Sequence, residues 1–544
     1  MIKPYISKFQ EAVKSWWMFK SLCDYDGAEY TYGEVAQRIG KLHTAFELAG
    51  IARGEHIALC AKNSAAWGIS FLSITTYRAV VVPILVDFTP DAVAQLTTHS
   101  DAVVLFTDKD LWARLDPAAM PHLRAAVNVD GGTLLYATDE RIRSAFDNAD
   151  AEFGRRYPDG FTADDVNYPD GDEKDLALIN YTSGTTSSPK GVMIRYESLS
   201  DQVEWDQVHL PATSADKLVS MLPMAHMYGL MIEFLYPVCS GVTIYFLGRT
   251  PSPSLLMGAM RKVRPYLIAS VPLVMEKIYK KNLQGPVHKL RPLLWLPVVG
   301  TLLYRKMGRK LLDAFGGRVR MMVLGGAPMN REAEKVFHRA GIPYIVGFGM
   351  TEGAPLITYA EIDEYIPGTC GKPIHEMRID SEDPQHIAGE ILTRGVNICS
   401  GYYKNPQATA DAFTEDGFLR TGDLGVLDSH GNLIIKGRSK TMILSANGQN
   451  IYPEEIESVL NAEKYIAESL VVDRSGRLVA LIYLDQEKIR KDSLDAESVA
   501  DIPHSTMTAV NKVLPSYSQL AKVEVVVEPF AKTPKMSIKR FMYK

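Results

Sequence analysis

Short apolar runs rich in β-branched residues alternate with helix-like segments through most of this 544-residue chain. The pattern begins near Tyr30 and resumes after Pro169. Such alternation is typical of parallel strands joined by crossover helices. The runs that we expect to form buried strands are residues 56–60, 80–85, 102–106, 176–181, 218–222, 243–246, 267–269, 320–324 and 344–348. The pattern therefore predicts an α/β protein of layered sheets and helices.

The pattern changes after Gly389, where Asp-Gly, His-Gly and Ser-Gly pairs separate short segments. Such pairs favour the tight turns of antiparallel hairpins. Residues 477–484 and 522–527 read as strands of a small α+β unit that begins near Ser439. We therefore expect a large N-terminal domain over residues 1–438 and a small, mobile C-terminal domain over residues 439–544.

The charge balance and the cysteines exclude several classes of protein. The chain has 59 basic and 64 acidic residues, a net charge of −5, whereas a dedicated nucleic-acid binder normally has a basic excess. We therefore expect no nucleic-acid partner. The five cysteines are scattered, without metal-ligand spacing, which is typical of a reducing compartment.

The N-terminus lacks the apolar core of a signal peptide, and no run of 18 apolar residues is free of charge. We expect a cytoplasmic protein, with peripheral contact at a membrane as an open alternative. The apolar run 292–304 supports that alternative, because Arg305, Lys306, Arg309 and Lys310 follow it and such a segment can lie on a lipid surface or guide a lipid chain. A helix buried against the sheet is the competing interpretation.

Residues 181–193 read Tyr-Thr-Ser-Gly-Thr-Thr-Ser-Ser-Pro-Lys-Gly-Val-Met and follow an expected buried strand. Gly184 and Gly191 permit unusual backbone angles, and Lys190 supplies a positive charge. Such a loop can wrap a polyphosphate. It is not a Walker P-loop, because Lys190 lies between a proline and a glycine. A polar loop without a ligand is the alternative.

Two further clusters carry groups that could bind a nucleotide. After the strand that ends near Phe348, Thr351 and Glu352 could hold phosphate and magnesium, since this hard cation prefers carboxylate and phosphate oxygens. In isolation, a strand-end turn with a solvated glutamate is the better interpretation of that segment. Asp423 and Arg438 could bond to the hydroxyls of a ribose, although a lone aspartate in a turn is usually only a turn former.

Together these segments resemble the adenylate-forming superfamily of AMP-binding enzymes. The resemblance covers nearly the whole chain from Tyr30 onward. The motifs that carry it are residues 181–193, Leu222-Pro-Met-Ala-His-Met-Tyr-Gly229, Gly325-Gly-Ala-Pro328, Gly349-Met-Thr-Glu352, Thr421-Gly-Asp423, Gly437-Arg438 and Tyr452-Pro-Glu-Glu-Ile-Glu457. Residues 263–280 and 444–453 are similar to the long-chain fatty acyl-CoA synthetase branch.

The resemblance implies an AMP-forming acid–thiol ligase. Such an enzyme uses ATP and magnesium to convert a carboxylic acid to an acyl-adenylate, and it then transfers the acyl group to the thiol of CoA. A medium- or long-chain fatty acid is the implied substrate. The pantetheine of an acyl carrier protein is the alternative acceptor, and the small domain is implied to rotate between the two half-reactions.

The resemblance also implies roles for individual residues. The implied phosphate loop comprises Thr182, Ser183, Gly184, Thr185, Thr186 and Lys190. Thr351 would touch the α-phosphate and Glu352 would hold magnesium. Adenine would be flanked by Gly325, Gly326, Ala327 and Phe348, and ribose would be bound by Asp423 and Arg438. His226 would lie where the acyl pocket meets the reacting carboxylate, Lys440 at the hinge, and Gly448 along the pantetheine path.

One departure from the family pattern affects the chemistry directly. Relatives carry a lysine near the C-terminus that bridges the carboxylate and the α-phosphate, and Ser537 stands in its place. Two anions that meet need a cation between them, which a serine does not supply. Side chains alternate in an extended segment, so Lys535, Ser537 and Lys539 share one face. We expect Lys535, or Lys539 as second choice, to substitute; a binding protein with weak adenylation is the alternative.

Overall fold

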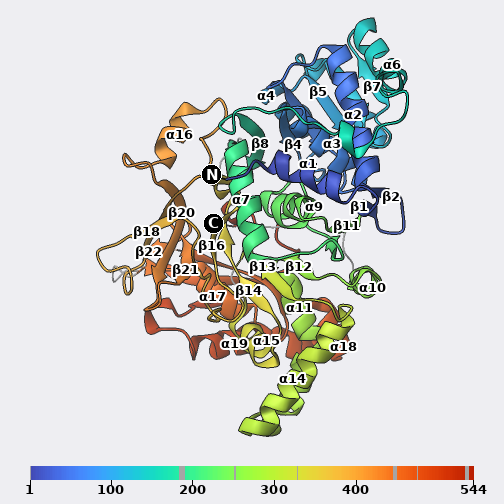
Figure 1. The fold of residues 1–544 in the computed structure, drawn as a ribbon. Coiled ribbons are helices and arrows are strands. Elements are labelled where there is room, and N and C mark those ends of the chain that lie inside the picture. Colours follow the sequence, from blue (N-terminus) through green and yellow to red (C-terminus); the bar gives the residue numbers. More distant parts are fainter. Residues whose placement is uncertain are drawn as a thin grey trace.

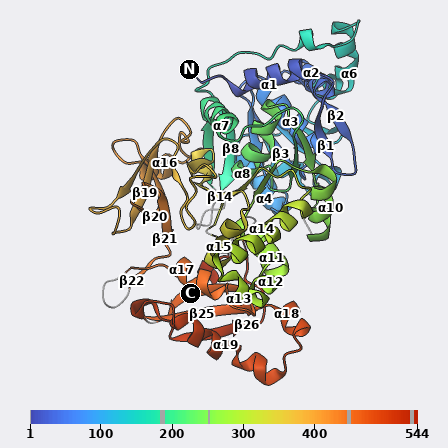
Figure 2. The ribbon, with the colours of Figure 1, turned by 60° about the horizontal axis from the view of Figure 1, so that its bottom comes forward.

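The computed structural model describes residues 2–182, 190–249, 253–327, 329–444, 450–474, 476–532 and 538–543. Two large sheets and their helices form a large N-terminal domain, and a smaller C-terminal domain lies at one end of it (Figures 1 and 2). The mixed α/β architecture that the alternating sequence pattern predicts is confirmed.

The first sheet has seven strands in the order β7-β6-β5-β3-β4-β8-β9, and its central strands are parallel. Antiparallel hairpins, β6–β7 and β8–β9, close its two edges. The strands are β3 (His56–Cys60), β4 (Val80–Pro83), β5 (Val104–Thr107), β6 (Ala125–Asn128), β7 (Leu134–Ala137), β8 (Leu176–Thr182) and β9 (Lys190–Arg195).

The second sheet has the order β14-β13-β12-β10-β11-β1-β2, and only the edge strand β2 is antiparallel to its neighbour. Its strands are β1 (Lys20–Asp24), β2 (Glu29–Thr31), β10 (Lys217–Ser220), β11 (Thr243–Phe246), β12 (Leu267–Ser270), β13 (Met321–Leu324) and β14 (Tyr344–Val346). Strands β12, β13 and β14 are buried along their whole lengths, as expected for a parallel sheet covered on both faces.

Helices cover the sheets, and α3 (Ala65–Thr76) contacts strands of both. It is buried along nearly its whole length, which explains why its sequence is apolar on all sides. The other helices are α1 (Tyr5–Ser15), α2 (Tyr32–Ala49), α4 (Pro90–His99), α5 (Lys109–Trp112), α6 (Glu140–Arg156), α7 (Tyr196–His209), α8 (Met227–Leu230), α9 (Tyr236–Cys239), α10 (Pro253–Val263), α11 (Pro272–Asn282), α12 (Gln284–Lys289), α13 (Arg291–Leu294), α14 (Pro297–Ala314), α15 (Arg331–Ala340) and α16 (Pro406–Ala412). Short turns are η1 (Pro117–Ala119), η2 (Ala163–Asp165), the π-helical η3 (Met231–Leu235) and η4 (Thr351–Gly353).

Antiparallel strands follow the two large sheets; the sequence predicts them only after Gly389, whereas they begin at Phe348. They form a three-stranded sheet, β15-β16-β17, and a four-stranded sheet, β18-β19-β20-β21. Their bounds are β15 (Phe348–Gly349), β16 (Leu356–Tyr359), β17 (Lys372–Pro373), β18 (Glu376–Asp380), β19 (Gly389–Arg394), β20 (Leu419–Leu427) and β21 (Leu433–Arg438).

The C-terminal domain has its own apolar core, to which Leu460, Ile482 and Val510 each contribute a fully buried side chain. Its main sheet, β24-β25-β26, has one antiparallel and one parallel pair. The elements are β22 (Ile443–Leu444), β23 (Asn450–Ile451), α17 (Pro453–Leu460), β24 (Ile466–Arg474), β25 (Arg477–Leu484), α18 (Gln486–Lys491), α19 (Ala496–Asn511), η5 (Ser516–Ser518), β26 (Lys522–Val526) and η6 (Arg540–Met542).

Several of the polar motifs follow the carboxyl ends of strands in these sheets. Thr182 ends β8, Leu222 follows β10, Gly325 follows β13 and Phe348 follows β14. The carboxyl ends of strands in open α/β sheets are where such folds place ligands. Across the described part of the chain, no helix combines the length and the apolar character needed to cross a bilayer.

Candidate active site

The hydroxyl-rich segment is placed only at its two ends. Ser183, Gly184, Thr185 and Thr186 lie outside the described residues, whereas Thr182 and Lys190 are paired in the β8–β9 ladder. Gly191 is needed for space rather than for unusual backbone angles, because a Cβ there would lie 2.8 Å from Cγ2 of Ile179. The hairpin thus fixes where the segment leaves and re-enters the sheet.

Lys190, Tyr402 and Glu352 form a continuous chain of contacts beside that segment. The Lys190 Nζ lies 4.8 Å from the centre of the Tyr402 ring, and the Tyr402 hydroxyl donates to Glu352 Oε1 at 2.9 Å. Backbone bonds hold the same unit together, since the Tyr403 N–H donates to the Gly191 carbonyl at 2.8 Å. Lys190, where the chain re-enters the sheet after the hydroxyl-rich segment, therefore lies near the Glu352 carboxylate.

Thr351 and Glu352 lie in the η4 turn and are only 7% and 8% exposed. Burial raises the pKa of the Tyr402 hydroxyl, and the nearby Glu352 charge adds to that effect. Among the described residues, hydrogen bonds to the carboxylate reach only Oε1 of Glu352. A single carboxylate with an unengaged oxygen fits magnesium shared with phosphate oxygens and water, which is how this ion usually binds. The described residues include no cluster of three or more metal-ligating side chains that would form a cage of protein ligands.

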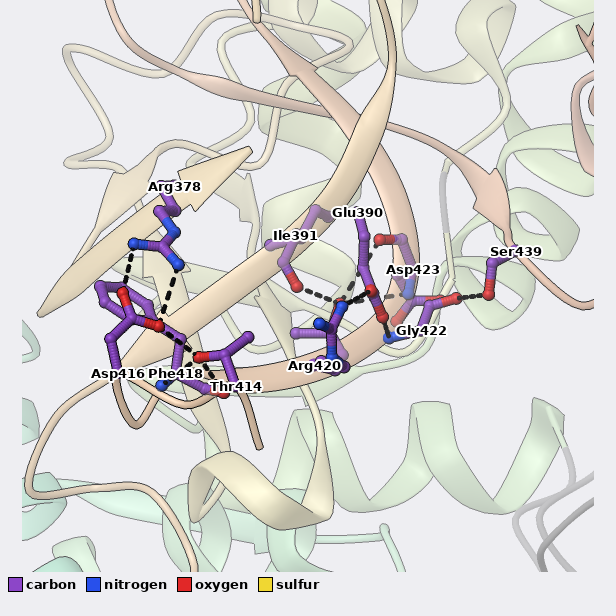
Figure 3. Close-up of polar contacts among 11 residues, drawn as sticks. Arg378, Glu390, Ile391, Thr414, Asp416, Phe418, Arg420, Gly422, Asp423 and Ser439 are labelled. Carbon is purple, nitrogen blue, oxygen red and sulfur yellow. Dashed lines mark hydrogen bonds and ion pairs between the residues drawn. The ribbon is translucent and has the colours of Figure 1, made fainter. Parts of the chain in front are cut away.

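The turn that carries Asp423 is held by a polar network on β19 and β20 (Figure 3). Glu390 accepts hydrogen bonds from the Gly422 N–H and from Arg420, each at 3.0 Å. The Thr421 hydroxyl donates to the Ile391 carbonyl at 2.8 Å and accepts from the Asp423 N–H at 3.1 Å. The side chain of Asp423 is therefore presented from a backbone that is fixed on both sides.

Asp423 and Arg438 are cross-strand partners on β20 and β21, and Arg438 Nε lies 3.1 Å from Asp423 Oδ1. Burial raises the pKa of Asp423, the Arg438 charge opposes that rise, and the carboxylates of Glu454 and Glu352 increase it. Three carboxylates thus lie close enough to influence one another. Such a site favours ligands that bring cations or hydroxyl donors with them.

The Gly325–Ala327 turn follows β13 beside Tyr228 of α8. Gly326 has φ +86°, a conformation that side chains with a Cβ rarely adopt, which explains the glycine. The Tyr228 hydroxyl donates to the Val323 carbonyl at 2.8 Å and so ties α8 to the end of β13. Gly326 and Ala327 are exposed, whereas Phe348 is 7% exposed, so a contact between its ring and a base stays a prediction.

His226 is half-buried at the N-terminus of α8, in a segment fixed by two asparagines. Asn63 donates to the Leu222 carbonyl at 2.6 Å and accepts from the Met224 N–H at 3.0 Å. Asn180, on β8, donates to the Ala225 carbonyl at 2.9 Å. These bonds position the His226 backbone between the two large sheets.

Glu233 binds the start of the same segment, at residues 220–222. Its Oε2 accepts from the Ser220 hydroxyl at 3.1 Å and from the N–H groups of Met221 and Leu222 at 2.9 Å each. Burial raises its pKa to about 8, and its Oε1 has no hydrogen-bond partner among the described residues. It lies in the π-helical turn η3, a local geometry that is frequent at functional sites.

Lys440 is exposed between the two domains, directly after Ser439, which is bonded to the Gly422 carbonyl through its N–H at 3.0 Å and its hydroxyl at 3.1 Å. Gly448, Lys535 and Ser537 lie outside the described residues. Both flanks of residues 533–537 are anchored. Lys532 is bonded to Glu468, and Arg540 is bonded to Glu457 and lies 3.4 Å from Glu454.

Further contacts join the two domains in the described arrangement. Lys280, on α11, donates to the carbonyl of Asn461 at the C-terminal end of α17 with a distance of 2.8 Å. Burial lowers the pKa of Lys280. Lys436 also lies 3.2 Å from Glu455, so two lysines of the large domain bind α17 and its end.

Sequence reasoning missed four residues that shape this site: Asn63, Asn180, Glu233 and Tyr402. No signal marks Tyr402, because its partner Glu352 is 50 residues away in the sequence. Glu233 did carry a signal, since it is the only charged residue in the apolar run 227–239. A charge in such a run is buried and needs partners.

Family models match both parts of the chain. The model described as "AMP-binding enzyme" matches residues 9–403, and the model of the "AMP-binding enzyme C-terminal domain" matches residues 440–543. The long-chain-fatty-acid–CoA ligase FadD15 of Mycobacterium bovis is 28% identical over 520 residues, which cover 89% of this chain and 83% of that protein. The long-chain-fatty-acid–[acyl-carrier-protein] ligase AEE15 of Arabidopsis thaliana is 25% identical and covers 94% of this chain and 81% of its own.

Solved structures share the fold. ATP-bound MatB from Rhodopseudomonas palustris has a TM-score of 0.78 at 21% identity, covering all of this chain and 98% of its own. The O-succinylbenzoate coenzyme A synthetase MenE from Bacillus subtilis, in complex with AMP, has a TM-score of 0.74 at 20% identity with the same coverage. At this level of identity the likeness supports the fold, and the choice of acid has to be argued from other observations.

Proposed function

Since this chain belongs to the family of AMP-binding enzymes, we propose that it activates a medium- or long-chain fatty acid with ATP and transfers the acyl group to the thiol of CoA. The observation that carries the proposal is the contact chain from Lys190 through Tyr402 to Glu352, with Asp423 close enough for the Glu352 charge to raise its pKa. The choice of a fatty acid is supported by the names of the relatives with high coverage.

In the first half-reaction, a carboxylate oxygen of the acid forms a bond to the α-phosphorus of ATP. The bond from that phosphorus to the bridging oxygen breaks, and pyrophosphate leaves. Lys190 and the loop that begins at Thr182 would bind the phosphates, and Thr351 would orient the α-phosphate. Holding the two reactants in line supplies much of the acceleration in such transfers.

Glu352 would hold magnesium, which supplies positive charge to the phosphate oxygens when bound. Asp423 would accept hydrogen bonds from the ribose hydroxyls, and the Arg438 charge opposes the rise in its pKa that burial causes. Gly325, Gly326, Ala327 and Phe348 would flank the adenine. His226 would lie beside the reacting carboxylate. Its position is fixed by the hydrogen bonds that Asn63, Asn180 and Glu233 make to the backbone of the segment that precedes it.

In the second half-reaction, the thiol sulfur forms a bond to the acyl carbonyl carbon, and the bond from that carbon to the AMP oxygen breaks. We propose that the domains divide after residue 438 and turn about Lys440, so that the segment with Gly448 lines the path of the pantetheine. Lys440 is exposed and Ser439 is tethered, which is a suitable arrangement for a hinge.

Acid-dependent exchange between ATP and pyrophosphate, scored over saturated acids of increasing chain length, tests the first half-reaction. We expect exchange with the longer acids and its loss in Glu352→Gln. Glu361→Gln is the matched control, because Glu361 is a half-buried glutamate paired with His209 outside the site. Absence of exchange with every acid in the series would contradict the proposal and favour a protein that only binds nucleotide and acid.

The cation that replaces the lysine missing at position 537 is a separate question. We propose Lys535, because side chains alternate in an extended segment, and residues 535, 537 and 539 would share one face if their segment is extended. Pyrophosphate release should fall by about a hundredfold or more in Lys535→Ala, the order of loss seen when one transition-state contact is removed, and remain close to normal in Lys539→Ala. The reverse result would assign the role to Lys539.

The acceptor thiol has a second candidate, because one relative with 94% coverage of this chain is named as an acyl-carrier-protein ligase. Thioester formation measured with CoA and with a phosphopantetheinylated carrier protein, at equal thiol concentrations, separates the two. We expect the higher kcat/KM with CoA. Faster transfer to the carrier protein would overturn that choice and leave the first half-reaction untouched.

A further inference from the structure

The α13–α14 region ends in an exposed apolar surface, which we call the α13–α14 tip and define as residues 293–302. Among the described residues, eighteen large apolar side chains are exposed, and six of them lie in this stretch of ten. They are Leu293, Trp295, Leu296, Val298, Val299 and Leu302, with exposed fractions from 41% for Val299 to 82% for Trp295. Helix α14 projects from the body of the molecule below the sheets (Figure 1).

The tip is held rigidly although its side chains are exposed. The far half of α14 packs on α15, where Gly308 lies so close to Ala340 that a Cβ would be 2.1 Å from the carbonyl oxygen. Leu311 is buried, and Leu294 anchors the base of the tip with 8% exposure. The buried-helix interpretation of this segment therefore holds for one face of α14 and is wrong for the tip.

The sequence that carries the tip is strongly basic. Residues 277–312 contain nine lysines and arginines and no aspartate or glutamate, in a chain whose net charge is −5. Four of the basic residues, Arg305, Lys306, Arg309 and Lys310, follow the tip along α14. All four are exposed, and no acidic side chain of the described ranges lies within ion-pair distance of them.

We propose that the α13–α14 tip inserts into the interface of an anionic lipid bilayer. Val298 and Leu302 are four residues apart, which spans about 6 Å along a helix and matches the shallow depth at which interfacial helices bury their apolar side chains. Arg305 and Lys306 begin one turn further along and thus reach the level of the lipid phosphates, where basic residues bind anionic headgroups. Tryptophan is enriched at this boundary, and Trp295 is the most exposed of the large apolar side chains of the tip.

The charge pattern also decides against other occupants of the surface. In a dimer formed through the tip, the four basic residues of α14 would lie close to the same four residues of the second copy. Repulsion between these like charges would oppose dimerisation. A nucleic acid would pair with the basic residues and leave six apolar side chains in water. An anionic bilayer satisfies both the apolar and the basic groups. This inference goes beyond the proposed ligase activity and does not depend on it.

Co-sedimentation with large vesicles tests the proposal, using phosphatidylcholine alone and phosphatidylcholine mixed with phosphatidylglycerol. We expect the wild-type chain to bind the anionic vesicles and the double variant Trp295→Asp/Val298→Asp to lose binding. Arg305→Gln/Arg309→Gln should weaken binding to the anionic vesicles by about thirtyfold, because each basic residue near the surface contributes a factor of about five and the two factors multiply. Val527→Asp is the matched control, because Val527 is 92% exposed on the C-terminal domain.

Each outcome decides the question. Binding of the tip variant at the wild-type level, or no binding of the wild-type chain to anionic vesicles, overturns the proposal. A wild-type dimer in light scattering that the tip variant converts to a monomer overturns it as well. Unchanged far-UV circular dichroism and an unchanged unfolding midpoint confirm that the variants are folded. Exchange activity with a water-soluble medium-chain acid keeps this test separate from that of the ligase.

Discussion

The hydroxyl of Tyr402 offers a test of the site that spares its backbone and its packing. Tyr402→Phe removes the hydrogen bond to Glu352 Oε1, which measures 2.9 Å, and keeps the ring that Lys190 contacts. Glu352 is 8% exposed, so the carboxylate loses a donor in a place that water reaches poorly. A hydrogen bond to a charged group contributes roughly 1.5–3 kcal/mol, and partial replacement by water leaves an expected loss of about 1–2 kcal/mol.

The neighbouring residue supplies a matched control. The Tyr403 hydroxyl also donates to a carboxylate, Asp101, at 2.7 Å, but that pair includes no residue proposed to bind nucleotide or metal. Tyr403→Phe therefore removes a similar bond one residue away. The two variants should differ in function rather than in the kind of bond that they lose.

The assay is acid-dependent exchange between ATP and pyrophosphate, measured as magnesium and ATP are varied. A loss of about 1–2 kcal/mol corresponds to a factor of about 5–30, which we expect in the apparent affinity for magnesium and ATP in Tyr402→Phe. Tyr403→Phe should titrate like the wild type. If Tyr402→Phe titrates like the wild type, or if both variants lose affinity equally, Tyr402 does not position Glu352 and the reasoning is refuted.

Two further predictions concern charged groups outside the nucleotide contacts. Burial raises the pKa of Glu233 from 4.5 to about 8, so between these pH values the folded chain holds a proton that the unfolded chain has released. The free energy of unfolding should therefore fall as pH rises through this window, by up to about 1.4 kcal/mol per pH unit. Glu233→Gln should flatten that slope in urea titrations. If the unfolding free energy of the wild type, relative to that of Glu233→Gln, rose with pH in this window, the burial argument would be contradicted. Lys280→Ala removes the hydrogen bond to the Asn461 carbonyl, and the loss of a contact of about 1 kcal/mol should make protease cleavage between the domains about fivefold faster. Lys281 is exposed, so Lys281→Ala should leave the cleavage rate unchanged. Equal rates in the wild type and both variants would show that Lys280 does not hold the domains together.

Much of the fold can be predicted from local patterns. Residues 56–60 and 243–246 are strands with the expected bounds, because buried parallel strands are continuous apolar runs between helix-like segments. The apolar run from Gly68 to Phe88 is interrupted by Arg78, and the structure divides it there into the buried helix α3 and strand β4. The β20–β21 and β24–β25 hairpins follow from the His-Gly and Ser-Gly pairs that separate their strands.

The parts that could not be predicted depend on contacts between distant segments. Tyr402 reaches Glu352 only because the Val192–Tyr402 bridge places residues 399–403 beside β9. The pairing of Arg438 with Asp423 requires the register of β20 and β21, which a sequence pattern does not specify. For α14, the apolar run predicts a helix, but which of its faces meets α15 follows only from the packing.

The two hydrogen bonds from Ser439 to the Gly422 carbonyl connect the proposed hinge to the turn that carries Asp423. If the small domain swings about residues 439–441, that carbonyl loses two donors at once, and the peptide that leads into Asp423 is released with it. We expect the hold on the ribose to slacken as the domain turns. Once the thiol has displaced AMP in the turned arrangement, the nucleotide would leave from a site that already holds its ribose less tightly.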